Sequence, residues 1–277
     1  MFTYFCKDLK RFLLTYYLLA LIISGNGYCQ ETYENSAFKT GEYLKYKVYY
    51  SSSLGNLTAG EAILTVDEWK ERNSTDNRSI FHITGIGNSK GFFDWFYKVR
   101  DRFESHVDQE TLLPYMFVRR TREGKYVYDD DVFFNRKKNV AQSRRATKPI
   151  PNDVHDIISA LYYLRTLNLD DFNADSTYAL SFYLDDSLYN TSIKFVSRGR
   201  MKTIWGWLDC LKFSPKVVAG EVFSDEYPMS IWITDDNNHL PILAESKVVV
   251  GSIKMELIEF SGLKTQPIFV EEKRKRR

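Results

Sequence analysis

The five residues from Gly87 to Gly91 read G-N-S-K-G and match the G-x-S-x-G pattern around Ser89. In α/β-hydrolases this pattern holds a nucleophilic serine on a sharp strand-to-helix turn, and a histidine acts as its base. His239 follows in the required chain order. That fold needs several βαβ units, whereas this chain has one convincing helical segment. We therefore interpret the pentapeptide as a loop between strands and expect no enzyme, with a serine hydrolase using Ser89 and His239 as the alternative.

The stretch "PIPNDVHDIISALYYLR" brings Asp153, His155 and Asp156 within four residues. Asn152 or Asp153 stands where an N-cap belongs, and acidic residues in a first turn complement the helix dipole. The two carboxylates therefore have a structural reason to be there. A protonated His155 would be disfavoured in that turn, so we expect its ring to make a polar contact with a neighbouring loop.

The same stretch predicts a helix over residues 153–167. Ile157, Leu161 and Leu164 follow one another at helical spacing and form one apolar face. A helix with such a face must pack on another element. We expect this helix to cover a sheet.

The remaining histidines do not form a metal-binding motif in the sequence. His82, His106 and His239 are far apart, without H-x-H or H-x-x-x-H spacing. A metal site needs two or three convergent ligands, and residues from distant segments could meet only in space. We expect no metal and no other cofactor.

The rest of the chain alternates apolar and polar residues, as half-buried strands do. Leu44, Tyr46, Val48 and Tyr50 share one face of a first strand, and a run from Phe96 to Val107 alternates in the same way. Turn residues separate many short strands at even spacing, without alternating helices. The sequence predicts a mostly β fold: one large curved antiparallel sheet or half-barrel with one covering helix.

Aromatic residues are abundant, with 19 Tyr, 19 Phe and five Trp. Trp205 and Trp207 are expected on one face of a strand within "MKTIWGWLDCLKF". Cross-strand pairing in a packed core explains such residues, because aromatics suit strands. The alternative is that they line a concavity for an apolar ligand. The candidate ligand-binding residues are Tyr46, Tyr50, Trp205, Trp207 and Trp232.

The N-terminus predicts a signal peptide over residues 1–29. Three basic residues precede the apolar run "FLLTYYLLALII", which is too short to span a bilayer, and cleavage is expected after Cys29. The mature chain would then keep Cys210 as its one cysteine, read as a buried inert thiol. We expect a secreted, periplasmic protein with one β-rich domain over 30–270 and no transmembrane segment.

The charge balance argues against a nucleic-acid partner. Cleavage removes three of 38 basic and one of 36 acidic residues, and the tail at 271–277, "EEKRKRR", holds five of the basic residues that remain. The body therefore carries 30 basic and 33 acidic residues, without the basic excess that a nucleic-acid surface needs.

Several phrases resemble the bacterial secreted family of unknown function numbered thirty-one-oh-eight. They are "FKTGEYLKYKVYY", "TAGEAILTV", "VRDRFESHVDQETLLPYMFVRR", "DVHDIISALYYLR", "SIWITDDNNHLPILAESKV" and "GSIKMELIEF". The resemblance covers nearly the whole mature chain. It implies a cell-envelope protein of mostly antiparallel β structure, typical of Bacteroidetes-like bacteria, and supplies no catalytic residues.

Taken together, these features predict a non-enzymatic envelope protein. We expect a monomer that holds an apolar or lipid-like ligand, or a partner protein, in the concavity of its sheet. This prediction rests on the combination of export, many aromatic residues in strands and one covering helix.

Overall fold

The computed structural model describes residues 35–53, 55–69, 79–169, 172–173, 176–216, 227–247 and 251–271. The predicted signal peptide and all but the first residue of the predicted basic tail lie outside them. No helix in the described part of the chain is long and apolar enough to cross a membrane.

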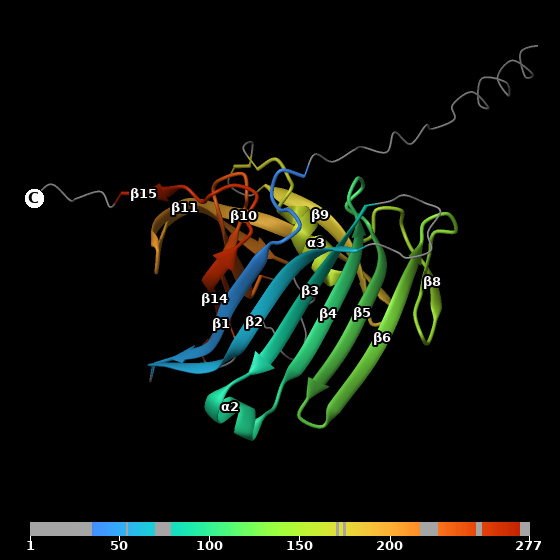
Figure 1. The fold of residues 1–277 in the computed structure, drawn as a ribbon, viewed down its shortest axis with the longest axis horizontal. Helices are drawn as coiled ribbons and strands as arrows, with labels where there is room; N and C mark the ends of the chain where they lie inside the picture. Colours follow the sequence, from blue (N-terminus) through green and yellow to red (C-terminus); the bar gives the residue numbers. More distant parts are fainter. Residues whose placement is uncertain are drawn as a thin grey trace, which may run out of the picture. The chain divides into compact units, whose positions relative to one another are not determined.

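The described residues form one antiparallel sheet and two short helices, which confirms the predicted fold class (Figure 1). The helices are α2 (Gly91–Phe96) and α3 (Ile157–Leu164). The strands are β1 (Tyr43–Ser52), β2 (Gly55–Trp69), β3 (Ile80–Ser89), β4 (Arg100–Asp108), β5 (Pro114–Glu123), β6 (Tyr126–Asn135), β7 (Val140–Gln142), β8 (Thr147–Pro149), β9 (Thr177–Leu184), β10 (Ser187–Thr203), β11 (Gly206–Pro215), β12 (Met229–Thr234), β13 (Pro241–Lys247), β14 (Ser252–Ser261) and β15 (Phe269–Val270).

The sheet consists of two meanders joined side by side. Its order is β8-β7-β6-β5-β4-β3-β2-β1-β14-β13-β12-β11-β10-β9, and β15 pairs with β11. Strands β8 and β9 are therefore the two ends of this order, although they are neighbours in the chain. The connection between them contains α3, which contacts β3, β4 and β9. Because β4 and β9 belong to different meanders, α3 packs between the two halves of the curved sheet.

Helix α3 begins four residues later than the sequence predicts. Its N-cap is Asp156, whose carboxylate accepts hydrogen bonds from the backbone N–H groups of Ile158 and Ser159, both at 2.8 Å. His155, the residue before this N-cap, has an extended backbone and pairs with the edge of β9. His155 N donates to Ser181 O at 3.0 Å, and His155 O accepts from Tyr183 N at 2.8 Å. A helix starting at Asp153 would take away these backbone bonds.

The buried face of α3 also differs from the prediction. Ile157 is 43% exposed, whereas Ile158, Ala160 and Tyr162 lie in the main core. Leu161 and Leu164 are only partly buried. The buried face of the helix is therefore rotated relative to the predicted one. The helix contacts β3 and β4 as well as β9, so it buries residues other than those of the single predicted face.

A buried ion pair fixes the chain where it leaves α3. Arg165 donates to both carboxylate oxygens of Glu42, at 2.7 and 2.8 Å, and the two side chains are 2% and 0% exposed. The guanidinium also donates to the carbonyls of Asn238, at 3.2 Å, and Ala37, at 3.3 Å. Its carbon lies 5.0 Å from the ring centroid of Tyr162. One side chain thus joins α3 to the segment before β1 and to the β12–β13 turn.

Removing one member of this pair is expected to destabilise the fold strongly. Arg165→Met should lower the free energy of unfolding by about 3–5 kcal/mol, because it leaves the Glu42 carboxylate buried and unpaired. The double variant Glu42→Gln/Arg165→Met should recover part of the loss. Arg200→Met, which breaks the exposed pair with Asp209, serves as the control and should cost less than about 1 kcal/mol. Urea unfolding measures all three, and equal losses in the two single variants would contradict this assignment.

The buried ring of His155 is expected to make stability depend on pH. Burial, together with the nearby Arg136, lowers the pKa of His155 to about 3. The unfolded residue takes up a proton below about pH 6.5, so the free energy of unfolding falls as the pH drops from there toward 3. His155→Phe keeps a ring against Tyr163, where the two rings now stack at 4.6 Å, and removes the titrating group.

Urea unfolding at several pH values between 7 and 4 tests this. The variant should lose stability less steeply than the native protein, by up to ~1.4 kcal/mol per pH unit. Burial raises the pKa of Asp156 to about 6, and this carboxyl titrates in the same window with the opposite sign. It is present in both proteins, so the difference between them isolates His155. Parallel curves would contradict the prediction.

Candidate functional site

Ser89 lies at the end of β3 and fastens the loop that follows. Its hydroxyl donates to Asp94 Oδ1 at 2.7 Å and accepts from Val99 N at 2.9 Å. Asp94 in turn accepts from Arg100 at 2.6 Å. Hydrogen bonds from Arg100 and Ser89 lower the pKa of Asp94 to about 2, so this carboxylate is ionised at neutral pH.

His239 lies elsewhere in the sheet. It lies in the turn that precedes β13, and its Nδ1 is 2.6 Å from Arg165 O. Four strand-to-strand steps separate β3 from β13 in the sheet order. The structure therefore does not bring Ser89 and His239 together, and each side chain has a structural partner.

The connection between β3 and β4, which Ser89 holds in place, contains α2. The most exposed aromatic side chains of the described residues lie on this helix. The exposed fractions of Phe92, Trp95 and Phe96 are 61%, 83% and 72%, and Tyr97 is also exposed. The rings of Phe92 and Phe96 stack at 6.3 Å, and Trp95 lies 6.0 Å from Phe92. We call these four residues the aromatic patch. Figure 1 shows α2 at one end of the sheet, where β3 passes into β4.

Helix α2 is not predicted from the sequence. The run from Phe96 onward was expected to be a strand, but the chain is helical up to Phe96, and β4 begins only at Arg100. A usable signal was present: "GFFDWFY" has five aromatic residues and one carboxylate. A strand of that composition needs cover on both faces, and at the end of a sheet this run has none.

Basic and apolar residues surround the aromatic patch. Tyr97 packs against Gly124 in the β5–β6 turn, and Gly124 N donates to Lys98 O at 2.8 Å. Lys98 and Lys125 are exposed. Lys90 N donates to Ala59 O at 2.9 Å and thereby holds the start of α2 against β2. Further exposed apolar side chains at the starts of β2 and β6 are Leu57, Tyr126 and Val127.

The interior of the curved sheet is largely filled. A small apolar cavity of about 50 Å³ remains between the end of α3 and strands β9 to β13. Its lining comprises Leu161, Leu164, Arg165, Leu167, Leu169, Phe172, Tyr178, Ile193, Phe213, Ile231, Ile233 and Pro241. Apart from the guanidinium of Arg165 and the hydroxyl of Tyr178, these side chains are apolar. The volume is about a third of the ~150 Å³ engineered cavity that admits benzene in another protein.

None of the five predicted ligand-binding aromatics lines this cavity. Tyr46 is buried in the main core, and its hydroxyl donates to Pro241 O at 3.1 Å. Tyr50 is half-buried near the end of β1, beside Gly251. The lining residues that the sequence did not point to come mainly from "LYYLRTLNL" and from the five later strands β9 to β13, which only the fold brings together.

The tryptophans of that set pack against different partners. Trp205 packs edge-on against Phe260 at 4.8 Å. It lies in the turn before β11, because Gly206 adopts a φ of 137°, and so it does not share a strand face with Trp207. Trp232 faces the ammonium group of Lys212 at 5.3 Å.

Two of the histidines that look isolated in the sequence meet on the sheet. His82 on β3 pairs directly with His106 on β4, and their rings stack at 4.6 Å. Glu104 Oε2 lies 2.7 Å from His82 Nε2. Burial, together with the neighbouring His82, lowers the pKa of His106 to about 4. We call His82, Glu104 and His106 the histidine cluster.

The histidine cluster faces away from α3. Ile83 belongs to the main core, and Gly85 approaches the side chain of Ile158, so β3 turns its odd-numbered residues toward the helix. On β4, Ser105 donates to Asp156 at 2.5 Å. Because side chains alternate along a strand, His82 and its neighbours on β4 lie on the outer face of the sheet.

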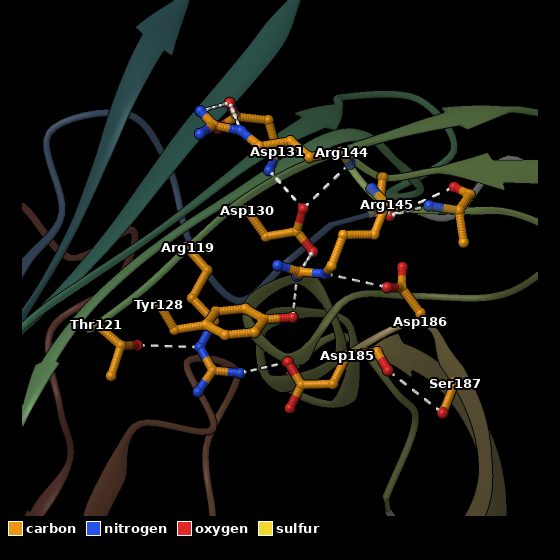
Figure 2. A network of polar contacts seen from close by, with 12 residues as sticks. Arg119, Thr121, Tyr128, Asp130, Asp131, Arg144, Arg145, Asp185, Asp186 and Ser187 are labelled. Atoms are coloured by element: carbon orange, nitrogen blue, oxygen red, sulfur yellow. Dashed lines mark hydrogen bonds and ion pairs between the residues drawn. The ribbon is translucent and has the colours of Figure 1, made fainter. Parts of the chain in front are cut away.

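The densest polar network joins the β9–β10 turn to the other meander (Figure 2). Arg119 on β5 pairs with Asp185 at 2.6 Å, and Arg145 pairs with Asp186 at 3.3 Å. Their guanidinium carbons lie 4.6 and 4.3 Å from the ring centroid of Tyr128. Burial and the nearby Asp185 raise the pKa of Tyr128 to about 12. These groups neutralise one another, so we interpret the network as a clamp that closes the sheet.

One solved structure with a TM-score above 0.5 supports the fold. A beta-barrel-like protein of the domain of unknown function DUF1849 from Brucella abortus has a TM-score of 0.53 and 10% identity, covering 81% of this chain and 98% of that chain. A protein inferred to be exported, with a YmcC-like fold, from Bacteroides fragilis NCTC 9343 has a TM-score of 0.29 and 13% identity, covering 81% and 97%.

No curated protein matches the chain. The family resemblance inferred from the sequence is confirmed, since a family model matches residues 45–258. The phrases that carry the resemblance include strands β1, β4 and β14 and the helix α3. The chain belongs to DUF3108, a family of proteins of unknown function.

Proposed function

We propose that this chain is an exported, non-enzymatic cell-envelope protein that attaches to a lipid surface through its aromatic patch. The observation that carries the proposal is the exposure of Phe92, Trp95 and Phe96 on one six-residue helix. Contiguous exposed apolar side chains mark interaction sites, whereas scattered ones do not.

The residue types in the patch suit a membrane interface. Trp and Tyr are enriched at the level of the lipid headgroups, because each ring has an apolar body and a polar tip. Transfer of a Phe-sized side chain from water is worth about 1.5–3 kcal/mol, so three such rings supply ~5–9 kcal/mol before the costs of binding. After the loss of motional freedom, this supports reversible attachment.

The charges around the patch favour a lipid surface with acidic headgroups. Lys98 and Lys125 are exposed on the two turns beside α2, and a lysine near such a surface contributes about 1 kcal/mol. Lys90 is already paired with Glu61 at 2.9 Å and should add less. Asp94 within α2 is neutralised by Arg100.

Export is supported by the basic and apolar residues at the N-terminus, which lie outside the described residues. Absence of an enzymatic role is supported by the separation of Ser89 from His239 and by the structural hydrogen bonds that each makes.

Removing two rings of the patch should abolish most membrane attachment. We expect Trp95→Ser/Phe96→Ser to bind vesicles of phosphatidylcholine and phosphatidylglycerol at least tenfold more weakly than the native chain in a flotation assay. Lys98→Glu/Lys125→Glu should weaken binding to these vesicles and leave the weak binding to pure phosphatidylcholine unchanged.

The matched control is Ile204→Ser, which removes an equally exposed apolar side chain from the β10–β11 turn. It should bind vesicles as the native chain does. Equal binding by Ile204→Ser and the double aromatic variant would refute the proposal, as would failure of the native chain to bind either kind of vesicle. Retention of a protein partner without any lipid binding would assign the patch to protein recognition.

The apolar cavity supports a second candidate, a small apolar ligand in the concavity. The cavity of about 50 Å³ is smaller than the ~150 Å³ cavity that admits benzene in another protein. A whole lipid would have to displace the segment that follows α3 and break the Arg165 pair.

The native mass of the protein isolated from its own envelope separates the two sites. We expect the mass of the processed chain alone, without a bound phospholipid. A lipid retained by both the native chain and Trp95→Ser/Phe96→Ser would show that the interior opens. The lipid site would then be the concavity of the sheet and not the aromatic patch.

A further inference from the structure

We propose that the histidine cluster binds one divalent transition-metal ion of the zinc type on the outer face of the sheet. The sequence gives no motif for such a site, because His82 and His106 are far apart in the chain. One ligand atom from each of His82, Glu104 and His106 lies within 4.8 Å of the others.

The backbone explains why the three side chains converge. His82 and His106 are directly opposed in the antiparallel register of β3 and β4, and opposed residues carry their Cβ atoms about 4.5–5.5 Å apart. Glu104 is two residues before His106, so both project from the same face of β4. The strands thus fix all three positions before any ion binds.

The donor set matches zinc chemistry. Two imidazole nitrogens and one carboxylate oxygen form a three-ligand set with a fourth position left for water or a substrate. With bonds of about 2.0–2.2 Å, tetrahedral ligand atoms are roughly 3.3–3.5 Å apart. The observed separations are of this order, since His82 Nε2 is 2.7 Å from Glu104 Oε2 and no pair exceeds 4.8 Å. Rotation of side chains closes the site without moving the strands.

Neighbouring groups already orient the ligands. The hydroxyl of Tyr115 lies 3.3 Å from His106 Nδ1, which holds this ring from the side away from a metal bound at Nε2. Arg102 donates to Glu104 Oε1 at 2.6 Å and leaves Oε2 toward His82. Hydrogen bonds of this kind fix the ligands of natural metal sites.

Trp69 covers the two rings. Its ring lies 4.8 Å from that of His106 and 5.6 Å from that of His82, edge-on to both. This cover limits solvent access on one side and provides a reporter, since a paramagnetic ion bound to the cluster would quench Trp69. The competing explanation is that His82 and Glu104 form only a hydrogen bond that joins the two strands.

The experiment uses the exported chain without an affinity tag, treated with chelator and then titrated with Zn²⁺ in a calorimeter. We expect one saturable site. His106→Ala and Glu104→Gln should each weaken Zn²⁺ binding at least tenfold. The control Glu110→Gln removes an exposed carboxylate from the nearby β4–β5 turn and should bind as the native chain does.

Cobalt provides a second readout. Co²⁺ should give the visible absorption of a four-coordinate site and quench part of the tryptophan emission. Trp69→Phe should keep the absorption but lose the quenching. Circular dichroism of each variant establishes that it is folded, and His82→Asn replaces any variant that is not. The absence of a saturable site in the native chain, or unchanged binding in the folded cluster variants, overturns the proposal and leaves the strand-joining hydrogen bond.

Discussion

The buried ion pair between Glu42 and Arg165 is the interaction on which the interior of this protein depends. Two charges lose their hydration when buried, and the loss is offset only when geometry and hydrogen bonding are complete. Arg165 meets that condition by binding both carboxylate oxygens and two backbone carbonyls. It can do so only if α3, the start of β1 and the β12–β13 turn keep their relative positions. The pair therefore fixes these three segments relative to one another.

Specific polar contacts also hold the two ends of the curved sheet together. Strands β8 and β9 end the sheet order without pairing with each other, and side chains bridge the two meanders. His155 offers its backbone to β9, while Arg119 and Arg145 hold the turn of Asp185 and Asp186 against Tyr128 (Figure 2). Both turn residues have a positive φ, of 50° and 57°. This two-residue turn has the twist that antiparallel strands need, so the bridge is set by local geometry as well as by charge.

Sequence patterns predict most of the sheet and little of the candidate sites. Alternation places Leu44 and Tyr46 inside, as the structure confirms, because each strand has one face toward the core. The pattern fails where a residue has a second role: His155 stays extended to pair with β9, which moves the start of α3. The histidine cluster arises from the register of β3 and β4, and α2 is a six-residue exposed helix at a sheet end. Neither feature therefore leaves a periodic signal in the sequence.

The G-x-S-x-G stretch shows why a motif needs its structural context. Ser89 holds Asp94 and the backbone of Val99, and Gly91 takes a φ of 56° where α2 begins. The residues that suggested a nucleophile instead fix the loop that presents the aromatic patch. The exposed rings of α2 are held by a buried serine and an ionised carboxylate, so they stay ordered while projecting into solvent, which lowers the entropic cost of binding.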